Sequence, residues 1–214
     1  MWDWGYAQAI MPDLLVGVWY TLIVTVASSI IALVGGLGIA LLEHASSRIG
    51  RTLVRAVLEL VRGVPILVLL FFGFYVLPEY GIIMAAMPIG IAVLGLVYAT
   101  FCSEVYRGSL ASIPPSLWDA CTALNLSPYV KWRRVMIPLM LKRSAPALAN
   151  YVLIIIRQTS FLFAIGVPVL MGKASVTAFQ SFRYLEPFTI AGLLYFAMNI
   201  PFIFLFSRLK TEHQ

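Results

Sequence analysis

Charged side chains are scarce in this chain of 214 residues: only 11% are Asp, Glu, Lys or Arg, while 61% are hydrophobic. A soluble domain carries about 25% charged residues. The surplus of apolar surface requires lipid as its solvent, which indicates an integral membrane protein. The net charge of +6 does not indicate a nucleic-acid partner, because Lys and Arg in membrane proteins mark cytoplasmic loops and must be read by position.

Cysteine and histidine are also scarce. Cys102 and Cys121 form no metal or redox pair by spacing and are expected to be reduced packing thiols. Neither of the two histidines has a ligand partner at helical spacing, and His44 is expected to be a solvated surface residue. With no catalytic constellation of side chains, the sequence offers no support for an intramembrane enzyme.

Long apolar runs fill most of the chain. A spanning helix needs about 20 predominantly apolar residues, and five stretches meet this requirement. The sequence therefore predicts an all-α membrane protein with five transmembrane helices in a single domain, residues 1–214. We expect Pro12 and Asp13 to start the first helix. The approximate ranges are 14–42, 52–77, 84–110, 138–167 and 187–207.

Lys and Arg alternate between the connections. None precedes Arg48, the second connection has none, and the fourth carries only Lys173 and Arg183. Because basic loops stay in the cytoplasm, we predict an N-terminus outside the membrane, a cytoplasmic C-terminal tail, and cytoplasmic first and third connections. The basic residues of those two connections are Arg48, Arg51, Arg55, Lys131, Arg133, Arg134, Lys142 and Arg143.

The third connection contains a short segment with its own helix signals. Ser116 and Asp119 have the spacing of a capping box, in which the serine side chain accepts from the N3 amide and the carboxylate from the N-cap amide. Asn125 suits the left-handed residue that closes a helix. The pattern predicts a short cytoplasmic helix over residues 116–125.

A second helix is expected directly after it. Ser127 is a suitable N-cap and Pro128 a suitable first residue. This helix should carry Lys131, Arg133 and Arg134 and end where the fourth span begins, at Pro138.

The exposed face of the first short helix is expected to show Ala120 and Ala123 beside Trp118 and Leu124. Small and apolar residues on a short helix suit a groove on a partner protein. A helix lying in the lipid headgroups, with its basic neighbours as anchors, is the alternative. Spacing alone favours neither.

This segment resembles the EAA loop of ABC-importer permeases, whose pattern is Glu-Ala-Ala, three residues, Gly, nine residues, Ile-x-Leu-Pro. The spacing matches throughout, and each departure is chemically mild. The matching positions are Asp119, Ala120 and Cys121, then Asn125, then Val135, Met136, Ile137 and Pro138.

Further stretches resemble the polar amino acid branch of that family, and the resemblance covers nearly the whole chain. They are "VRGVPILVLLFF", "YATFCSEVYRGSLASIPPSLWDA" and "NYVLIIIRQTSF". The departures are Ser116-Leu117 for the usual Gly-Gln and Arg157-Gln158 for Lys-Asp. The stretches "FYVLPEYGI" and "ALNLSP" are most similar to permeases for ectoine and related compatible solutes.

The resemblance implies a type I ABC importer permease in the bacterial inner membrane, forming half of a translocation pathway with a second permease subunit. Two ATPase subunits would bind ATP and Mg²⁺, and a periplasmic solute-binding protein would dock near Pro78–Met84 and Gly172–Glu186. The short helix would be the coupling helix that docks on the ATPase. Its contact residues would be Trp118, Asp119, Ala120, Cys121, Ala123, Leu124 and Asn125.

The sequence contains no complete ATP-binding motif. A P-loop needs Gly, four residues, then Gly-Lys-Ser/Thr. The stretch "GVPVLMGKA", from Gly166 to Ala174, has five intervening residues and ends in Ala. ATP hydrolysis is therefore expected on a separate chain, with no cofactor bound by this one.

Ionisable residues within spans are costly and are treated as functional hypotheses. Arg157 is the deepest, and it could bind a solute carboxylate or pair with an acid or backbone carbonyls. Gln158, Thr159 and Ser160 follow it as candidate pathway residues, although Thr and Ser also join helices in lipid. Glu104 has Arg107 at i+3, so an ion pair competes with a pathway role.

An ion-coupled secondary transporter or channel is the rival class. It would use Glu104 and Arg157 as coupling charges. The absence of a convincing internal repeat disfavours it, because secondary transporters are often built from paired repeats.

Overall fold

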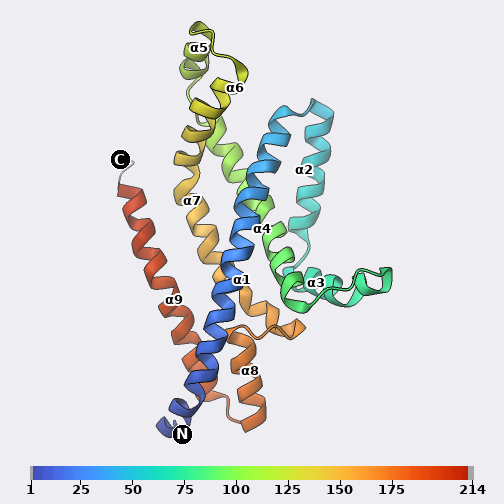
Figure 1. Ribbon diagram of the computed structural model, residues 1–214, viewed down its shortest axis with the longest axis vertical. Coiled ribbons are helices and arrows are strands. Elements are labelled where there is room, and N and C mark those ends of the chain that lie inside the picture. The colour runs from blue at the N-terminus through green and yellow to red at the C-terminus, as the bar shows by residue number, and fades with distance from the viewer. Residues whose placement is uncertain (1, 212–214) are drawn as a thin grey trace.

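The computed structural model describes residues 2–211, with side chains described as far as Pro201. This part of the chain is built from helices and contains no strand (Figure 1). The α-helices are α1 (Trp4–Ala45), α2 (Arg48–Gly63), α3 (Ile66–Phe71), α4 (Ala86–Ala111), α5 (Pro115–Ala123), α6 (Pro128–Lys131), α7 (Ile137–Gln158), α8 (Leu170–Ser181) and α9 (Leu185–Thr211). Two π-helical turns, η1 (Phe72–Val76) and η3 (Trp132–Met136), and two 3₁₀ segments, η2 (Leu77–Tyr80) and η4 (Thr159–Ile165), complete the element order.

The long helices run roughly parallel to one axis of the molecule (Figure 1). The N-terminus and α8 lie at one end, and α5 and α6 lie at the other. Three continuous helical segments of the described chain are long and apolar enough to cross a membrane: Trp4–Ala45, Ala86–Ala111 and Pro128–Ile165. A bent pair, Arg48–Gly63 with Ile66–Tyr80, provides a fourth if it is counted as one span.

The first helix begins earlier than the sequence predicts. The Asp3 side chain accepts a hydrogen bond from the amide of Tyr6, and the helix then runs unbroken from Trp4 past Pro12. The expected start at Pro12 and Asp13 is therefore wrong. An aspartate at the N-cap accepts a hydrogen bond from a first-turn amide that has no partner within the helix. The helix therefore starts at the residue that supplies this cap.

The second predicted span, residues 52–77, is not one straight helix. The chain bends by 94° between Arg48–Gly63 and Ile66–Tyr80. Val64 and Pro65 both have extended ψ angles, 129° and 136°. Proline lacks an amide hydrogen and pushes the preceding residue out of the helical region. The hydropathy does not reveal this break, because Val64 and Pro65 lie within a continuous apolar run.

The helix predicted from Ser127 and the fourth predicted span are not two separate helices. The helical path is continuous from Pro128 to Ile165, so Pro138 lies inside it. The π-helical turn Trp132–Met136 comes directly before Pro138. Proline removes a backbone donor and crowds the preceding turn, and a local π turn is one way for a helix to continue through such a site.

Residues 170–181, which were expected to lie in an outer loop, form helix α8. Helix α8 packs against α1, and the side chains on its buried face are small: Gly172, Ala174 and Ala178. The approach is close, since a Cβ on Gly17 of α1 would lie 2.7 Å from the Cα of Leu170. The stretch that resembled a P-loop is split between a left-handed turn at Gly166 and the start of α8. Helix α9 covers the fifth predicted range.

Among the long helices, α1 and α4 make the most extensive contact. A Cβ on Gly36 would lie 2.6 Å from the Cβ of Cys102 and 2.9 Å from the carbonyl oxygen of Ala99, so only glycine allows this approach. Gly38, two residues on, faces open space. Small residues let backbones approach closely in lipid, which places the core of the bundle along α1, α4 and α7.

Candidate functional site

Helix α5 lies at the end of the bundle, connected to α4 and α6 by short turns (Figure 1). It begins at Pro115, and no side chain caps it. Proline is favoured at a first helical position, so the helix starts ahead of Ser116 and places Asp119 in its second turn. The predicted capping box between Ser116 and Asp119 is therefore wrong.

The end of α5 follows the sequence closely. Asn125 has a φ of 48°, the left-handed conformation that the pattern predicted. The amide of Leu126 donates to the carbonyl of Cys121 (3.1 Å), and the amide of Asn125 donates to that of Thr122 (3.0 Å). These two bonds are a Schellman motif. Ser127 then caps the next helix by accepting from the amide of Val130.

The two faces of α5 differ. Ala120, Ala123 and Leu124 are exposed, and Leu124 retains 71% of its accessible surface. Asp119 and Asn125 are exposed beside them. A helix surface this apolar is available to a partner.

Cys121 is buried on the opposite face and Trp118 is half-buried, so they attach α5 to the bundle. Lys131 lies with its ammonium nitrogen 4.7 Å from the centre of the Trp118 ring. The Trp132 ring meets Trp118 edge-on at 6.0 Å, and His44 at the end of α1 stacks on it at 6.3 Å. The expectation that Cys121 lies on the partner face is therefore wrong, because its side chain is buried, and Trp118 is only partly available there. His44 is also more than a solvated surface residue, because it joins α1 to α5 and η3.

A chain of alternating charges links α1, α2 and α4. Arg55 pairs with the buried Glu43 (2.5 Å), and Arg107 reaches both Glu43 (4.0 Å) and Glu104. Arg62 pairs with Glu104 (3.4 Å). It pairs with Glu59 as well (3.0 Å) and donates to Thr100. The predicted local pair of Glu104 with Arg107 is confirmed. The links between helices were not predicted, because the pairs Arg55–Glu43, Arg62–Glu104 and Arg107–Glu43 are separated by 12, 42 and 64 positions.

Helices α4 and α7 pack together. Phe101, Glu104 and Gly108 recur at three- and four-residue spacing on α4, which places them on one side of the helix. The Phe101 ring lies 5.9 Å from that of Tyr151 on α7, so this side borders α7.

On α7, Arg143, Asn150 and Arg157 recur every seven residues and are all exposed. Asn150 was not predicted as a site residue, although its seven-residue spacing from Arg157 indicates that the two lie on one side of the helix. Arg157 forms no ion pair or hydrogen bond with any side chain in the described part of the chain. A charged residue at the bilayer centre costs about 2.5–3.5 kcal/mol on insertion scales, so this face is unsuited to lipid.

Arg157 lies where the helix type changes. Helix α7 ends at Gln158, and the 3₁₀ segment η4 begins at Thr159. Thr159 is buried and donates to the carbonyl of Ile156 (2.6 Å), whereas Ser160 is half-buried. The Oε1 atom of Gln158 is buried without a hydrogen-bond partner in the described residues. Such an atom is unusual in a protein interior, and a short 3₁₀ stretch often marks a hinge.

The opposite end of the bundle carries a compact ionic cluster. Arg183 donates to Asp3 (3.1 Å) and Glu186 (3.0 Å), and its guanidinium lies 4.5 Å from the centre of the Tyr6 ring. The Tyr6 hydroxyl donates to Ser181 (2.6 Å). These contacts tie the start of α1 to the turn between α8 and α9.

The cluster stabilises its charged forms. The pKa of Asp3 is lowered by the hydrogen bond from the Tyr6 amide and then by that from Arg183. Burial opposes ionisation of Glu186, but hydrogen bonds from its own amide and that of Asp3, with the Arg183 charge, outweigh burial and lower its pKa. The pKa of Arg183 is raised by its bond to Asp3.

Comparison with known proteins places these features in a family. Residues 32–211 match the family described as binding-protein-dependent transport system inner membrane component. The chain is 32% identical to a probable amino-acid ABC transporter permease protein, y4tG, of Sinorhizobium fredii, over 93% of this chain and 88% of the relative. It is 30% identical to the glutamine transport system permease protein GlnP of Escherichia coli, over 98% and 97%.

Solved structures agree with this match. A crystal structure of an amino acid ABC transporter with histidines superimposes with a TM-score of 0.90 at 25% identity, covering 99% of both chains. The MetNI methionine ABC transporter in an inward-facing conformation shares the fold, with a TM-score of 0.75 at 20% identity. The chain belongs to the family of binding-protein-dependent transport system inner membrane components, and it is the permease subunit of an ABC importer.

Proposed function

We propose that this permease moves a polar amino acid or a related zwitterion, and that α5 is its contact with the ATPase. The observation that carries the proposal is the two-faced character of α5. Cys121 and Trp118 attach one face to the bundle, while Ala120, Ala123 and Leu124 leave the other free. Small side chains allow close docking in a groove. Asp119 and Asn125 border this face and are assigned to the same contact.

The ATPase subunits, two per importer, would bind ATP and Mg²⁺ and hydrolyse the nucleotide. This assignment is supported by the resemblance of α5 to the EAA loop. We place α5 in the cytoplasm and the N-terminus outside, because Lys and Arg gather at the α5 end. The C-terminal tail is then cytoplasmic, and the protein lies in the bacterial inner membrane.

The solute would pass along the α4–α7 face, with a second permease subunit closing the path. Arg157 is suited to a solute carboxylate because it is exposed and unpaired in the described chain. The unpartnered Oε1 of Gln158 can accept from a solute amine, and Thr159 and Ser160 line the same junction. Glu104 is held by Arg62 and Arg107, so we assign it to fixing the path rather than to ion coupling.

A periplasmic solute-binding protein would dock near Pro78–Met84, in the arm that follows α3, and near Gly172–Glu186, at the α8 end of the bundle (Figure 1). The supporting observations are exposed apolar side chains in both predicted docking segments, with Tyr80 and Ile83 in one and Phe179 and Phe182 in the other. The relatives named above support an amino acid as solute. The resemblance to ectoine permeases stays a prediction.

The test is gentle purification of the tagged chain from its native membrane, followed by mass spectrometry of the associated proteins. We expect a stoichiometric chain with a P-loop, and the presence or absence of a second permease distinguishes a heterodimer from a homodimer. Purification of the chain alone, together with solute movement in ATP-free vesicles, would contradict the proposal and favour the ion-coupled class.

A further inference from the structure

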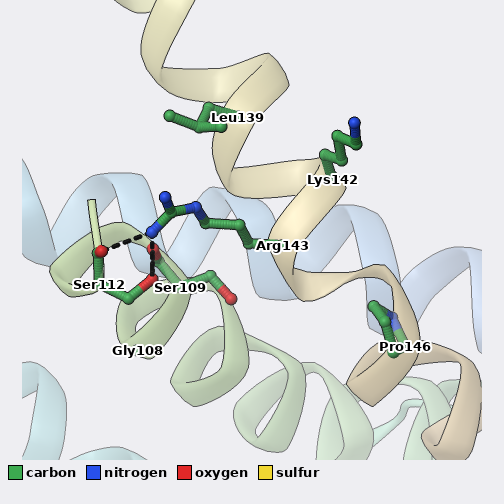
Figure 2. A pocket seen from close by; sticks show the side chains of 7 residues that line it. All are labelled: Gly108, Ser109, Ser112, Leu139, Lys142, Arg143 and Pro146. Atoms are coloured by element: carbon green, nitrogen blue, oxygen red, sulfur yellow. Dashed lines mark hydrogen bonds between the residues drawn. The ribbon is translucent and has the colours of Figure 1, made fainter. Parts of the chain in front are cut away.

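A cavity of about 670 Å³ opens between the last turn of α4 and the first half of α7 (Figure 2). It is open to its surroundings rather than enclosed. No acidic side chain lines it. It is lined on α4 by Gly108, Ser109 and Ser112, and on α7 by Lys142 and Arg143 with Leu139 as an apolar wall.

Arg143 is held in place across the mouth of this cavity. Its Nη1 group donates to the carbonyl oxygen of Ser112 and to the Ser112 hydroxyl, the latter at 3.0 Å (Figure 2). The carbonyl belongs to the C-terminal end of α4, where the helix dipole favours a cation. A guanidinium has five N–H donors, so the donors on Nε and Nη2 remain available to a ligand.

The rest of the cavity adds positive charge and space. Lys142 is exposed and forms no ion pair with an acidic side chain in the described part of the chain. A Cβ on Gly108 would meet no atom within 4 Å, so the α4 wall is open at this point. The Lys142 side chain points away from the Arg143 guanidinium (Figure 2), so it adds to the positive potential without sharing the same ligand atoms. An arginine fixed by its neighbours with hydroxyl groups beside it suits a ligand oxyanion.

We propose that this cavity is a second oxyanion site on the transport path, and that it receives the solute carboxylate on the α5 side of Arg157. The inference rests on the proposed function. Arg143 and Arg157 share one face of α7 and are two seven-residue steps apart, or roughly 21 Å along the helix. Two positive positions in series select solutes that carry a carboxylate and disfavour those with net positive charge.

The local potential is measured with an introduced thiol. Ser109→Cys is made in a Cys102→Ala, Cys121→Ala background, and the complete importer is reconstituted in phosphatidylcholine vesicles. The thiol is reacted with methanethiosulfonates that carry either a sulfonate or a trimethylammonium group, with rates normalised to a free thiol in solution. We expect the sulfonate reagent to react faster, and we expect its advantage to fall about tenfold when Lys142→Gln and Arg143→Gln are combined.

Arg134→Gln is the matched control, because Arg134 is an exposed basic residue on η3 that does not line the cavity. This variant should leave the reagent preference unchanged. Equal normalised rates for the two reagents at Ser109→Cys would overturn the proposal. This readout needs no transport, so it separates failure of the anion site from failure of the proposed function, which is measured as ATP-driven glutamine uptake in the same vesicles.

The ligand is identified by protection of the thiol. We expect glutamine to slow the reaction several-fold more than glutamine amide, which lacks the carboxylate. Equal effects of the two compounds would overturn the carboxylate assignment. Protection by added phosphatidylglycerol but not by glutamine would also overturn it, because the oxyanion would then be a lipid phosphate.

Discussion

The two ends of the bundle are held together by different kinds of contact. At the α8 end, hydrogen bonds and ion pairs join Asp3 to Arg183 and Glu186, and Tyr6 to Ser181, across more than 170 positions of sequence. At the other end, α5 is attached mainly by Trp118 and Cys121 and leaves a whole face exposed. The first end is fixed by contacts within the chain, and under the proposed function the second is the end that the ATPase moves.

The largest expected effect comes from blocking the free face of α5. We predict that Ala120→Arg lowers transport at least about 100-fold, because a long charged side chain in place of a methyl group prevents close docking and leaves a charge desolvated. Expression in the membrane should be unchanged, since Ala120 is exposed. Uptake by vesicles and membrane abundance on immunoblots provide the measurement.

Thr122→Arg is the matched control. It adds the same side chain at another exposed position of α5, about 160° around the helix from Ala120 and so away from the free face. We expect it to retain most of the uptake. Similar uptake by Ala120→Arg and the unmodified chain would contradict the ATPase contact.

The next effect concerns how α5 is attached. Trp118→Ala removes the ring that contacts Lys131, Trp132 and His44. We predict that ATP hydrolysis by the importer continues while solute moved per ATP falls about tenfold, because docking on α5 no longer displaces α7 and α1. Trp118→Phe keeps an aromatic ring and should recover most of the coupling. An unchanged ratio of transport to hydrolysis in Trp118→Ala would show that the ring does not transmit the movement.

A substitution at the α8 end of the bundle should affect transport less than a substitution on α5. Arg183→Gln removes the partner of Asp3 and Glu186 and leaves Glu186 buried without its cation. We predict a fall of a few degrees in the midpoint of thermal unfolding, with coupling of transport to ATP hydrolysis unchanged. Arg133→Gln, which removes a charge at the opposite end, serves as the control and should leave the midpoint nearly constant. A loss of coupling in Arg183→Gln would erase the distinction between the two ends.

The smallest effect is a dependence on pH. Asp3 and Glu186 have pKa values below their ordinary values of 3.8 and 4.5. Their contribution to stability is fully present above about pH 4.5, and it is lost as the pH falls through the lowered values. We expect the unfolding midpoint to fall more steeply with acid in the unmodified chain than in Arg183→Gln. Parallel curves for the two proteins would contradict the assignment.

Much of the architecture follows from local pattern. The apolar runs locate the long helices, and the signals at Asn125, Ser127 and Pro128 are confirmed because turn and cap chemistry acts over a few residues. The breaks are harder to read. The 94° bend at Gly63–Pro65 lies within an unbroken apolar run, and hydropathy does not record it.

Contacts between distant segments escaped the sequence for a physical reason. Pairing of Arg62 with Glu104 depends on α2 lying beside α4, which no local spacing encodes. The same holds for Trp118, whose orientation is set by aromatic neighbours on α1 and η3. The coupling and pathway residues stay predictions from the sequence, and their orientation requires the packed bundle.

The continuous helix from Pro128 to Ile165 also determines how far α5 stands from the lipid. About ten of its residues precede Pro138, the predicted entry into the membrane, and at 1.5 Å per residue they extend roughly 15 Å. The headgroup layer on each side of a bilayer is only about 5–8 Å thick. With the membrane entry proposed at Pro138, the helix would act as a spacer that holds α5 clear of the headgroups, and this clearance would give the proposed ATPase partner room to approach without meeting the membrane surface.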